Sequence, residues 1–344
     1  HVMCMKSKII LIILFGIFSK TLLIGQISTN TSLYTNDELV NAVLIGSSCI
    51  SATNVSFTGE AGQISYLVDG SQSIGLGSGI ILSTGDVMNT SNSPDNQIDM
   101  AWGGNVPGNG DSDLDAIIGA NETYDPAVLE FDITAQSNTI TFNYVFASEE
   151  YPDYVCSEYN DIFALLISGP GIVGQVNMAV LPNGDPVSIN TVNNGYADEF
   201  GGSPFCATGL NGNPTNAAYY TSNNTFETSG SVNAPNFIYD GFTVKLTATA
   251  TVIPCQTYHI KIAIADVYDG VWDSAIILEE GSLVSGANYS TIISTPTSNN
   301  DSIPEGCSGT VEFALDQTYT SDVSINYSVN GTATNGVDFT NLNG

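Results

Sequence analysis

The sequence predicts an all-β fold: an antiparallel β-sandwich of jelly-roll type with a short amino-terminal helix, followed by part of an immunoglobulin-like sandwich. Glycine (34 residues), tyrosine (16) and phenylalanine (14) are frequent in the 344 residues, as is typical of turn-rich β proteins. Short runs of apolar, β-branched and aromatic residues alternate with loops rich in Gly, Asn, Pro and Ser. A 3.6-residue apolar period is nearly absent, which excludes a doubly wound α/β fold.

The first 25 residues are interpreted as a secretion signal. Lys6 and Lys8 precede an apolar run over residues 9–18, which is short for a membrane span and fits a signal peptide. We expect residues 1–25 to be removed on export, and no later segment has the length to cross a bilayer. A buried amino-terminal helix is the alternative, although the run shows no amphipathic pattern.

Residues 36–44 form the best helix candidate, because Asp37 and Glu38 stand in its first turn and apolar residues follow. Residues 113–119 suggest a second, shorter helix. The predicted strands are 78–84, 127–133, 139–147, 161–168, 175–181, 241–252, 258–265 and 274–278. Residues 183–236 contain the longest loop, in which we expect a short strand near 187–191.

The domain boundaries follow from composition. Residues 26–286 are predicted to form the main sandwich, and residues 287–300 are rich in Ser, Thr and Asn and are interpreted as a linker. Residues 301–344 contain two expected strands, at 309–314 and 322–329. Because two or three strands are marginally stable alone, we expect this second domain to be truncated.

Charge is the most informative feature of the composition. The chain has 35 acidic residues and no arginine, and only Lys245 and Lys261 provide cations beyond the signal. Nucleic acids and anionic membrane surfaces require basic patches, so both are excluded as partners. Any close group of carboxylates must be solvated, protonated or bound to a metal ion, and hard oxygen ligands favour calcium.

Two groups of acids flank predicted strand ends. One lies between strands 139–147 and 161–168, and the other lies between strands 258–265 and 274–278. We predict that both loops meet at one end of the sandwich and share a calcium ion. The predicted ligands are Glu149, Glu150, Asp161, Asp266, Asp269 and Asp273. The alternative is that these acids are solvated or cap strand ends through backbone N–H groups.

A third acidic group has EF-hand-like spacing at Asp111, Asp113 and Asp115. Ala116 stands where the sharp turn of an EF-hand requires glycine. A helix start stabilised by acids is therefore favoured over a metal site.

The cysteines lack the CxxC spacing of a zinc site. In an exported protein they suggest disulfides, and the candidates are Cys49, Cys156, Cys206 and Cys255. Pairing of Cys156 with Cys206 is the first expectation, because both lie in polar, loop-like sequence. Such a bond is worth roughly 4 kcal/mol on the chain-entropy model.

Evidence for catalysis is weak. Glu149 and Glu150 are adjacent and point to opposite faces if extended, so a glycosidase would need a pair such as Glu150 and Asp273. No G-x-S-x-G motif occurs, and His259 lies within a predicted strand. Trp102 and Trp272 are candidate glycan contacts, although such aromatic residues more often belong to the core.

Three stretches resemble a known family. They are FNYVFASEEYPDYVCSEYNDIFALLISGPG at 142–171, YDGFTVKLTATATVIPCQTYHIKIAIADVYDGVWDSAIILEEG at 239–281, and GDSDLDAIIG at 110–119. Together with PVSINTVN at 186–193, they resemble the choice-of-anchor L family over residues 36–286. The resemblance implies an exported bacterial protein whose module is joined to different surface anchors. It implies no established biochemical activity.

The carboxyl-terminal part resembles a second family. IPEG at 303–306 and GTATNGVDF at 331–339 are similar to the Calx-beta module, of which only the first half would be present. Full-length relatives often end in a type IX secretion sorting domain, so we expect attachment through a missing carboxyl-terminal region.

These observations predict a non-enzymatic, secreted or cell-surface module for adhesion or surface display, with calcium-stabilised loops and a glycan or protein ligand. The competing class is a carbohydrate-binding or glycoside-cleaving β-sandwich.

Overall fold

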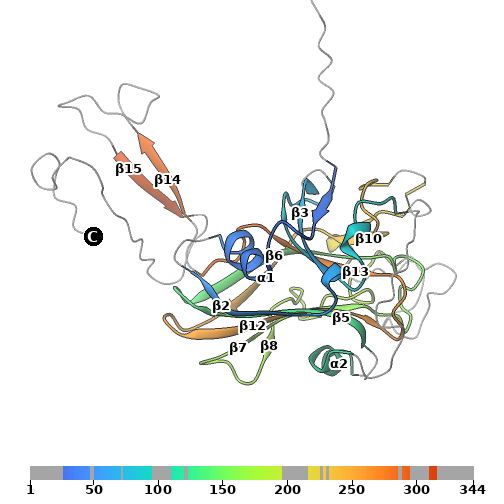
Figure 1. Ribbon diagram of the computed structural model, residues 1–344, viewed down its shortest axis with the longest axis horizontal. Coiled ribbons are helices and arrows are strands. Elements are labelled where there is room, and N and C mark those ends of the chain that lie inside the picture. Colours follow the sequence, from blue (N-terminus) through green and yellow to red (C-terminus); the bar gives the residue numbers. More distant parts are fainter. Residues whose placement is uncertain are drawn as a thin grey trace, which may run out of the picture.

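The computed structural model describes residues 26–46, 50–70, 73–94, 110–119, 123–195, 216–224, 228–229, 232–285, 289–294 and 310–315. Two antiparallel sheets stack face to face (Figure 1). The larger sheet has the order β1 (Ser28–Asn30), β3 (Ile64–Val68), β4 (Gly79–Ser83), β13 (Ser274–Glu279), β6 (Thr139–Ser148), β10 (Gly241–Thr243) and β9 (Tyr220–Ser222), and β11 (Leu246–Thr251) also pairs with β6. The smaller sheet has the order β2 (Ala52–Thr58), β5 (Thr123–Thr134), β12 (Thr257–Val267), β7 (Ile162–Ser168) and β8 (Val176–Asn177). The predicted all-β sandwich is confirmed.

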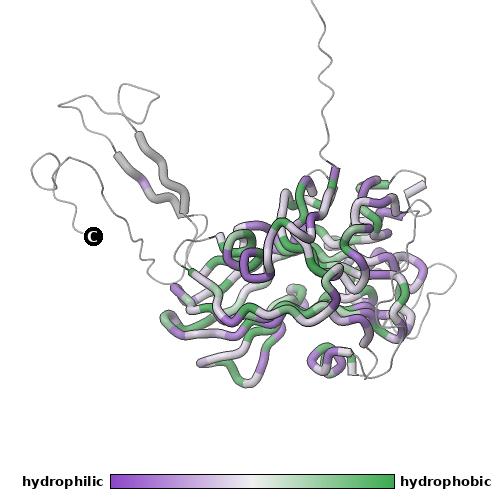
Figure 2. The backbone as a smooth tube through the Cα atoms, in the orientation of Figure 1, coloured by the Kyte–Doolittle hydropathy of each residue, from purple (hydrophilic) through white to green (hydrophobic). Residues whose placement is uncertain are grey.

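The main core lies between the sheets. Side chains of a strand alternate between its two faces, so Ile260, Ile262 and Ile264 of β12 join the core that contains Phe142 and Phe146 of β6. Burial of each such side chain contributes about 2–3 kcal/mol. Figure 2 shows hydrophobic residues along the strands of both sheets and hydrophilic residues in many connecting turns.

Both outer faces are partly covered as well. Ala263 and Ala265 of β12 point away from the main core and form a second cluster with Leu114 of α2 (Ser112–Ile118). Figure 1 shows α2 against the smaller sheet. On the larger sheet, Val145 and Ile277 pack against Phe237 from a loop. Strands β12 and β13 are therefore buried on both faces, which explains their nearly continuous apolar sequences.

The predicted amino-terminal helix is present. The α-helix α1 (Asn36–Glu38) continues into the wider π-helical turn η1 (Leu39–Leu44). Thr35 and Glu38 form a reciprocal capping box at its start, which satisfies exposed backbone donors. Short 3-10 turns are formed by η2 (Ala61–Gln63), η4 (Val87–Asn89) and η5 (Ala217–Tyr219).

Several predicted boundaries are wrong. The strand expected at 241–252 is divided into β10 and β11, and the one expected at 175–181 shortens to β8. Residues 187–191 form turns with an isolated bridge at Ser188. Within the segment interpreted as a linker, 287–300, β14 (Tyr289–Ser294) pairs with β15 (Thr310–Leu315), and the division into domains stays a prediction. The β-branched residues of YSTIIS favour a strand more strongly than its Ser and Thr content favours a linker.

Candidate functional site

The two acidic loops meet at one end of the sandwich. Glu149 and Glu150 follow β6, Asp161 precedes β7, Asp266 lies near the end of β12, and Asp273 precedes β13. Ser148 pairs with Ser274 in the larger sheet, and Ala265 pairs with Ile162 in the smaller one. We call Glu149, Glu150, Asp161, Asp266 and Asp273 the acid cluster. All five are buried, with exposures of 0–5%.

Part of the acid cluster is fixed by hydrogen bonds across the two sheets. Asp161 accepts from the Val267 backbone N–H at 3.0 Å and from the Ser274 hydroxyl at 2.6 Å. Glu149 accepts from the Asp273 backbone N–H at 3.1 Å, and its own N–H donates to the Asp273 carbonyl at 3.0 Å. These bonds join β7 to β12 and β13, so the predicted convergence of the loops is observed.

Some oxygens of Asp266 and Glu150 are buried without a hydrogen-bond partner among the described residues. They include both carboxyl oxygens of Asp266 and Oε2 of Glu150. The Thr84 hydroxyl lies near Asp266 and lowers its pKa, but its hydrogen bond goes to the Ser274 carbonyl at 3.4 Å. A buried polar atom without a partner costs about 1–3 kcal/mol, and more when it is charged.

Burial and mutual repulsion favour the neutral forms of these groups. Burial raises the pKa of Asp161 to about 7, although bonds from Ser274 and Val267 oppose this shift. Burial raises the pKa of Asp266 well above its usual range, and the charges of Asp161 and Asp273 add to the effect. For Glu150, burial and the charge of Asp161 act in the same direction. The protonated forms of Asp161, Asp266 and Glu150 are therefore favoured unless a cation replaces the protons.

Both lysines of the described residues pair with acids outside the acid cluster. Lys245 Nζ lies 2.9 Å from Glu279 Oε1. Lys261 Nζ lies 2.7 Å from Asp111 Oδ2 and 2.6 Å from Asp113 Oδ2. The chain has no arginine, so all the lysine and arginine side chains among the described residues are engaged by acids other than those of the cluster.

The backbone at Gly85 makes room for one member of the cluster. A Cβ atom at this position would lie 1.6 Å from Oδ2 of Asp273. Only glycine permits so close an approach, and the Asp273 carboxyl group therefore lies against the turn that follows β4.

The structure places one further acid, Asp125, beside the acid cluster, and it places the predicted ligand Asp269 at the edge of the cluster. Asp125 of β5 is buried, and its charge raises the pKa of Asp266. Its backbone φ of 44° coincides with a register shift opposite Ile264 and Asp266. Asp125 precedes Pro126 and lies outside both acidic loops in the sequence, so the spacing of the acids does not indicate its place beside the cluster. Asp269, a predicted ligand, is half-buried at the rim.

The carboxyl groups do not enclose a metal ion as they stand. In the described part of the chain, no three His, Cys, Asp or Glu side chains are close enough to hold one. The donor chemistry nevertheless fits calcium, since every group in the acid cluster is a hard oxygen donor. Binding would require side-chain rotation that brings the unpartnered oxygens of Asp266 and Glu150 together with their neighbours.

Four aromatic rings form a rim beside the acid cluster. Trp272, Tyr154, Tyr159 and Tyr268 contact one another in that order, with ring centroids 4.7–5.2 Å apart. Tyr268 and Trp272 have φ values of 81° and 67°, a conformation that costs of order 1–3 kcal/mol for such residues. The edge-to-face contacts of Trp272 show a packing role, and its predicted glycan contact stays a prediction. Trp102 lies outside the described residues.

The cysteine predictions have different outcomes. Cys156 is disulfide-bonded, whereas Cys255 is an exposed free thiol. Cys255 occupies the turn between β11 and β12 with a φ of 61°, and its candidacy as a disulfide residue is not supported. Cys49 and Cys206 lie outside the described residues, so the Cys156–Cys206 pairing stays a prediction.

The third acidic group starts a helix. Asp111 caps α2 by accepting from the N–H groups of Asp113 and Leu114, both at 3.1 Å. Asp115 accepts from the Thr123 hydroxyl at 2.8 Å. The ion pairs with Lys261 attach this helix to β12, so the favoured structural interpretation is observed.

We expect Lys261→Met to lower the free energy of unfolding by about 2–3 kcal/mol, because it leaves the largely buried Asp111 carboxylate without its cation. Chemical denaturation measures the change. Lys245→Met is the matched control: the Lys245 side chain is 41% exposed, so the loss should be about 0.5 kcal/mol. Equal losses in both variants would contradict the importance of the α2 attachment.

The candidate catalytic groups are poorly placed for substrate. Glu150 and Asp273 are 2% and 5% exposed, so a sugar cannot reach between them in this conformation. His259 lies on the outer face of the smaller sheet, where it interacts with Asp132 at 2.8 Å and Glu130 at 3.2 Å. Among the described residues, the imidazole therefore interacts with two carboxylates, and neither is a hydroxyl or thiol nucleophile that it could activate.

Comparisons with known proteins agree with the fold. Residues 27–284 match the family model described as Choice-of-anchor L domain. No curated protein and no solved structure matches the chain. Within the described residues, none of the helices is long and apolar enough to cross a membrane. The match covers well over half of the 344 residues, and the chain therefore belongs to the choice-of-anchor L family, whose domain is associated with bacterial surface proteins.

Proposed function

We propose that this chain is a non-enzymatic, secreted or cell-surface module for adhesion or surface display, stabilised by calcium. The ion would bind within the acid cluster, with Asp269 at its rim. The carboxyl-terminal part, which we expect to be Calx-beta-like, would continue toward the attachment region. Calcium binding and surface display both go beyond the family assignment, and each has its own experimental test.

One observation supports the calcium site above all others: five carboxyl groups are buried together in the acid cluster, while both lysines of the described residues pair with other acids. Transfer of even one ionised carboxylate from water to a protein interior costs several kcal/mol unless it is paired. Protons or a divalent cation must reduce this cost. Calcium accepts six to eight oxygen ligands, so carboxylates, backbone carbonyls and water can share one ion.

The proposed ion would connect segments that are distant in sequence. Glu149 and Glu150 belong to the turn after β6, Asp161 precedes β7, Asp266 belongs to β12, and Asp273 precedes β13. A calcium ion among them would link both sheets and restrain the loops at 149–160 and 268–273. Extracellular calcium sites typically have dissociation constants of about 0.1–1 mM, which suits a protein outside the cell.

Limited proteolysis tests this restraint. With millimolar calcium, we expect cleavage within residues 149–160 and 268–273 to slow by about tenfold relative to EDTA, because bound ligand reduces local opening. Mass spectrometry identifies the cleavage sites. The same concentration of magnesium is the control and should protect less, because magnesium demands tighter octahedral geometry. Identical cleavage with calcium and EDTA would contradict the calcium proposal.

The surface role has its own test. Protease added to intact bacterial cells that produce the full chain should degrade it while leaving a cytoplasmic marker intact. Comparison of adhesion between these cells and cells lacking the protein then separates adhesion from display alone. A chain protected in intact cells but digested after lysis would overturn the surface assignment, whatever the calcium result.

A further inference from the structure

A pocket at one edge of the sandwich supplies a possible binding site distinct from the acid cluster. Its volume is about 310 Å³, close to the lower end of the 300–1,000 Å³ that is common for small-molecule sites. It lies where β2 of the smaller sheet faces β1 and β3 of the larger one. We call this the edge pocket, and it is lined by Asn30, Thr31, Tyr34, Asn36, Leu39, Phe57, Gly59, Ala61, Ile64 and Ser65.

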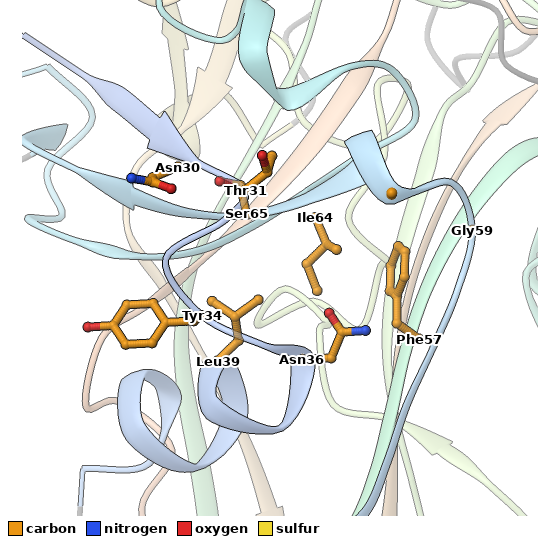
Figure 3. A pocket seen from close by; sticks show the side chains of 10 residues that line it. Asn30, Thr31, Tyr34, Asn36, Leu39, Phe57, Gly59, Ile64 and Ser65 are labelled. Atoms are coloured by element: carbon orange, nitrogen blue, oxygen red, sulfur yellow. The ribbon is translucent and has the colours of Figure 1, made fainter.

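The edge pocket has an uncharged lining, although the chain has a net charge of −30. Figure 3 shows Tyr34 and Phe57 on opposite sides of the hollow, with Leu39 and Ile64 between them. The amide of Asn36 lies beside Phe57. Aromatic and aliphatic walls can contact the C–H face of a ring, while amide and hydroxyl groups can bond to its edge.

Several contacts prepare this lining before a ligand binds. The ring of Tyr34 packs edge-to-face against Tyr66 at a centroid distance of 5.1 Å. The capping box of Thr35 and Glu38 fixes the turn that carries Tyr34 and Asn36. At Gly59, φ is 145° and a Cβ atom would lie 3.0 Å from the Phe57 ring, so this wall needs glycine. Such pre-organisation reduces the entropic cost of binding.

We propose that the edge pocket binds one uncharged sugar ring of a neutral glycan. The lack of charged residues in the lining disfavours ionic ligands, and the strongly negative chain repels acidic glycans in particular. The paired aromatic walls, the amides and the hydroxyls match a ring that is apolar on its faces and polar at its edge. This inference uses the proposed adhesive role to supply a ligand class, and it is independent of calcium binding.

A glycan array probed with the mature chain tests the assignment. We expect binding to neutral oligosaccharides but not to sialylated or sulfated ones. Tyr34→Ala and Asn36→Ala should each weaken binding by about tenfold, the effect of losing roughly one stacking or hydrogen-bonding contact. Asn36→Ala leaves the Tyr34–Tyr66 ring contact intact, so it remains informative if Tyr34→Ala fails to fold.

Tyr268→Ala is the matched control, because Tyr268 is an exposed aromatic residue of the aromatic rim beside the acid cluster. It should leave glycan binding unchanged. The proposal is overturned if the array shows no neutral ligand, if acidic glycans are preferred, or if Tyr268→Ala abolishes binding that Asn36→Ala retains. Measurement of the calcium-dependent melting shift on the same samples shows whether the calcium proposal fails or survives independently.

Discussion

Asp266→Asn is expected to abolish the calcium-dependent rise in melting temperature without destabilising the metal-free protein at pH 7.5. In wild type, calcium at about 100 times its dissociation constant contributes about 2.7 kcal/mol. For a domain of this size, that corresponds to a rise of about 5–10 °C. Asparagine keeps the shape of Asp266 but removes a buried group that is repelled by Asp161 and Asp273. Differential scanning calorimetry with calcium or EDTA measures both effects.

Asp37→Asn is the control for this variant, since Asp37 is exposed in the first turn of α1. It should retain the full calcium shift. The combination of a lost shift and an undiminished metal-free stability separates a metal ligand from a residue that only supports the fold. If Asp266→Asn keeps the wild-type shift, calcium does not bind through this carboxylate.

Metal-free protein is expected to lose stability as the pH rises from 5 to 8. The pKa of Asp161 is about 7 in the folded chain, compared with 3.8 for an ordinary aspartate. The folded state therefore binds more protons at Asp161 between these values, and the stability contributed by Asp161 is fully present below pH 3.8 and is lost as pH rises through about 7. For Asp161 alone the part of this loss that falls between pH 5 and 8 is roughly 3 kcal/mol. Urea unfolding in EDTA across this range measures it.

Calcium should remove most of this loss, because the ion stabilises the ionised carboxylates that dominate at higher pH. His259→Asn is the control, because His259 in the wild type also contributes stability that is lost as pH rises. Partial burial lowers the pKa of His259, but Asp132 and Glu130 raise it overall. Asp132, whose pKa is lowered by Asn54 and His259, loses its contribution as pH falls and therefore acts mainly below pH 5. A metal-free stability that increases from pH 5 to 8 in His259→Asn would contradict our account of the cluster.

Much of the fold could be predicted because its central strands have strong signals. The sequences of β5, β6, β12 and β13 contain apolar, β-branched and aromatic residues, and each was predicted. Strand β2 was missed because its sequence ATNVSFT is mostly polar and half-exposed at a sheet edge. Strand β3 was missed although its sequence ISYLV is apolar, since so short a run has no clear period.

The meeting of the two acidic loops could be predicted because a loop keeps the ends of the two strands that it connects close together, here β6 with β7 and β12 with β13 across the two sheets. The structure places Asp161 within hydrogen-bond distance of Ser274, the residue that follows Asp273, and the role of these acids as metal ligands stays a prediction. Reasoning from the loops could not find Asp125, whose carboxyl reaches the cluster through an irregular register between β5 and β12. Nor could it find the role of Gly85, because close contact with Asp273 depends on the pairing of β4 with β13.

Isothermal titration of metal-depleted protein with calcium at pH 7 is the most direct test of whether the acid cluster binds an ion. Performed in two buffers with different ionisation heats, it measures both binding and proton release. We predict about one calcium ion per chain and a net release of protons, because the ion displaces those held by Asp161 and Asp266. This assignment would be contradicted if calcium shows no saturable binding. It would also be contradicted if calcium binds without releasing protons and the Asp266→Asn variant still binds it.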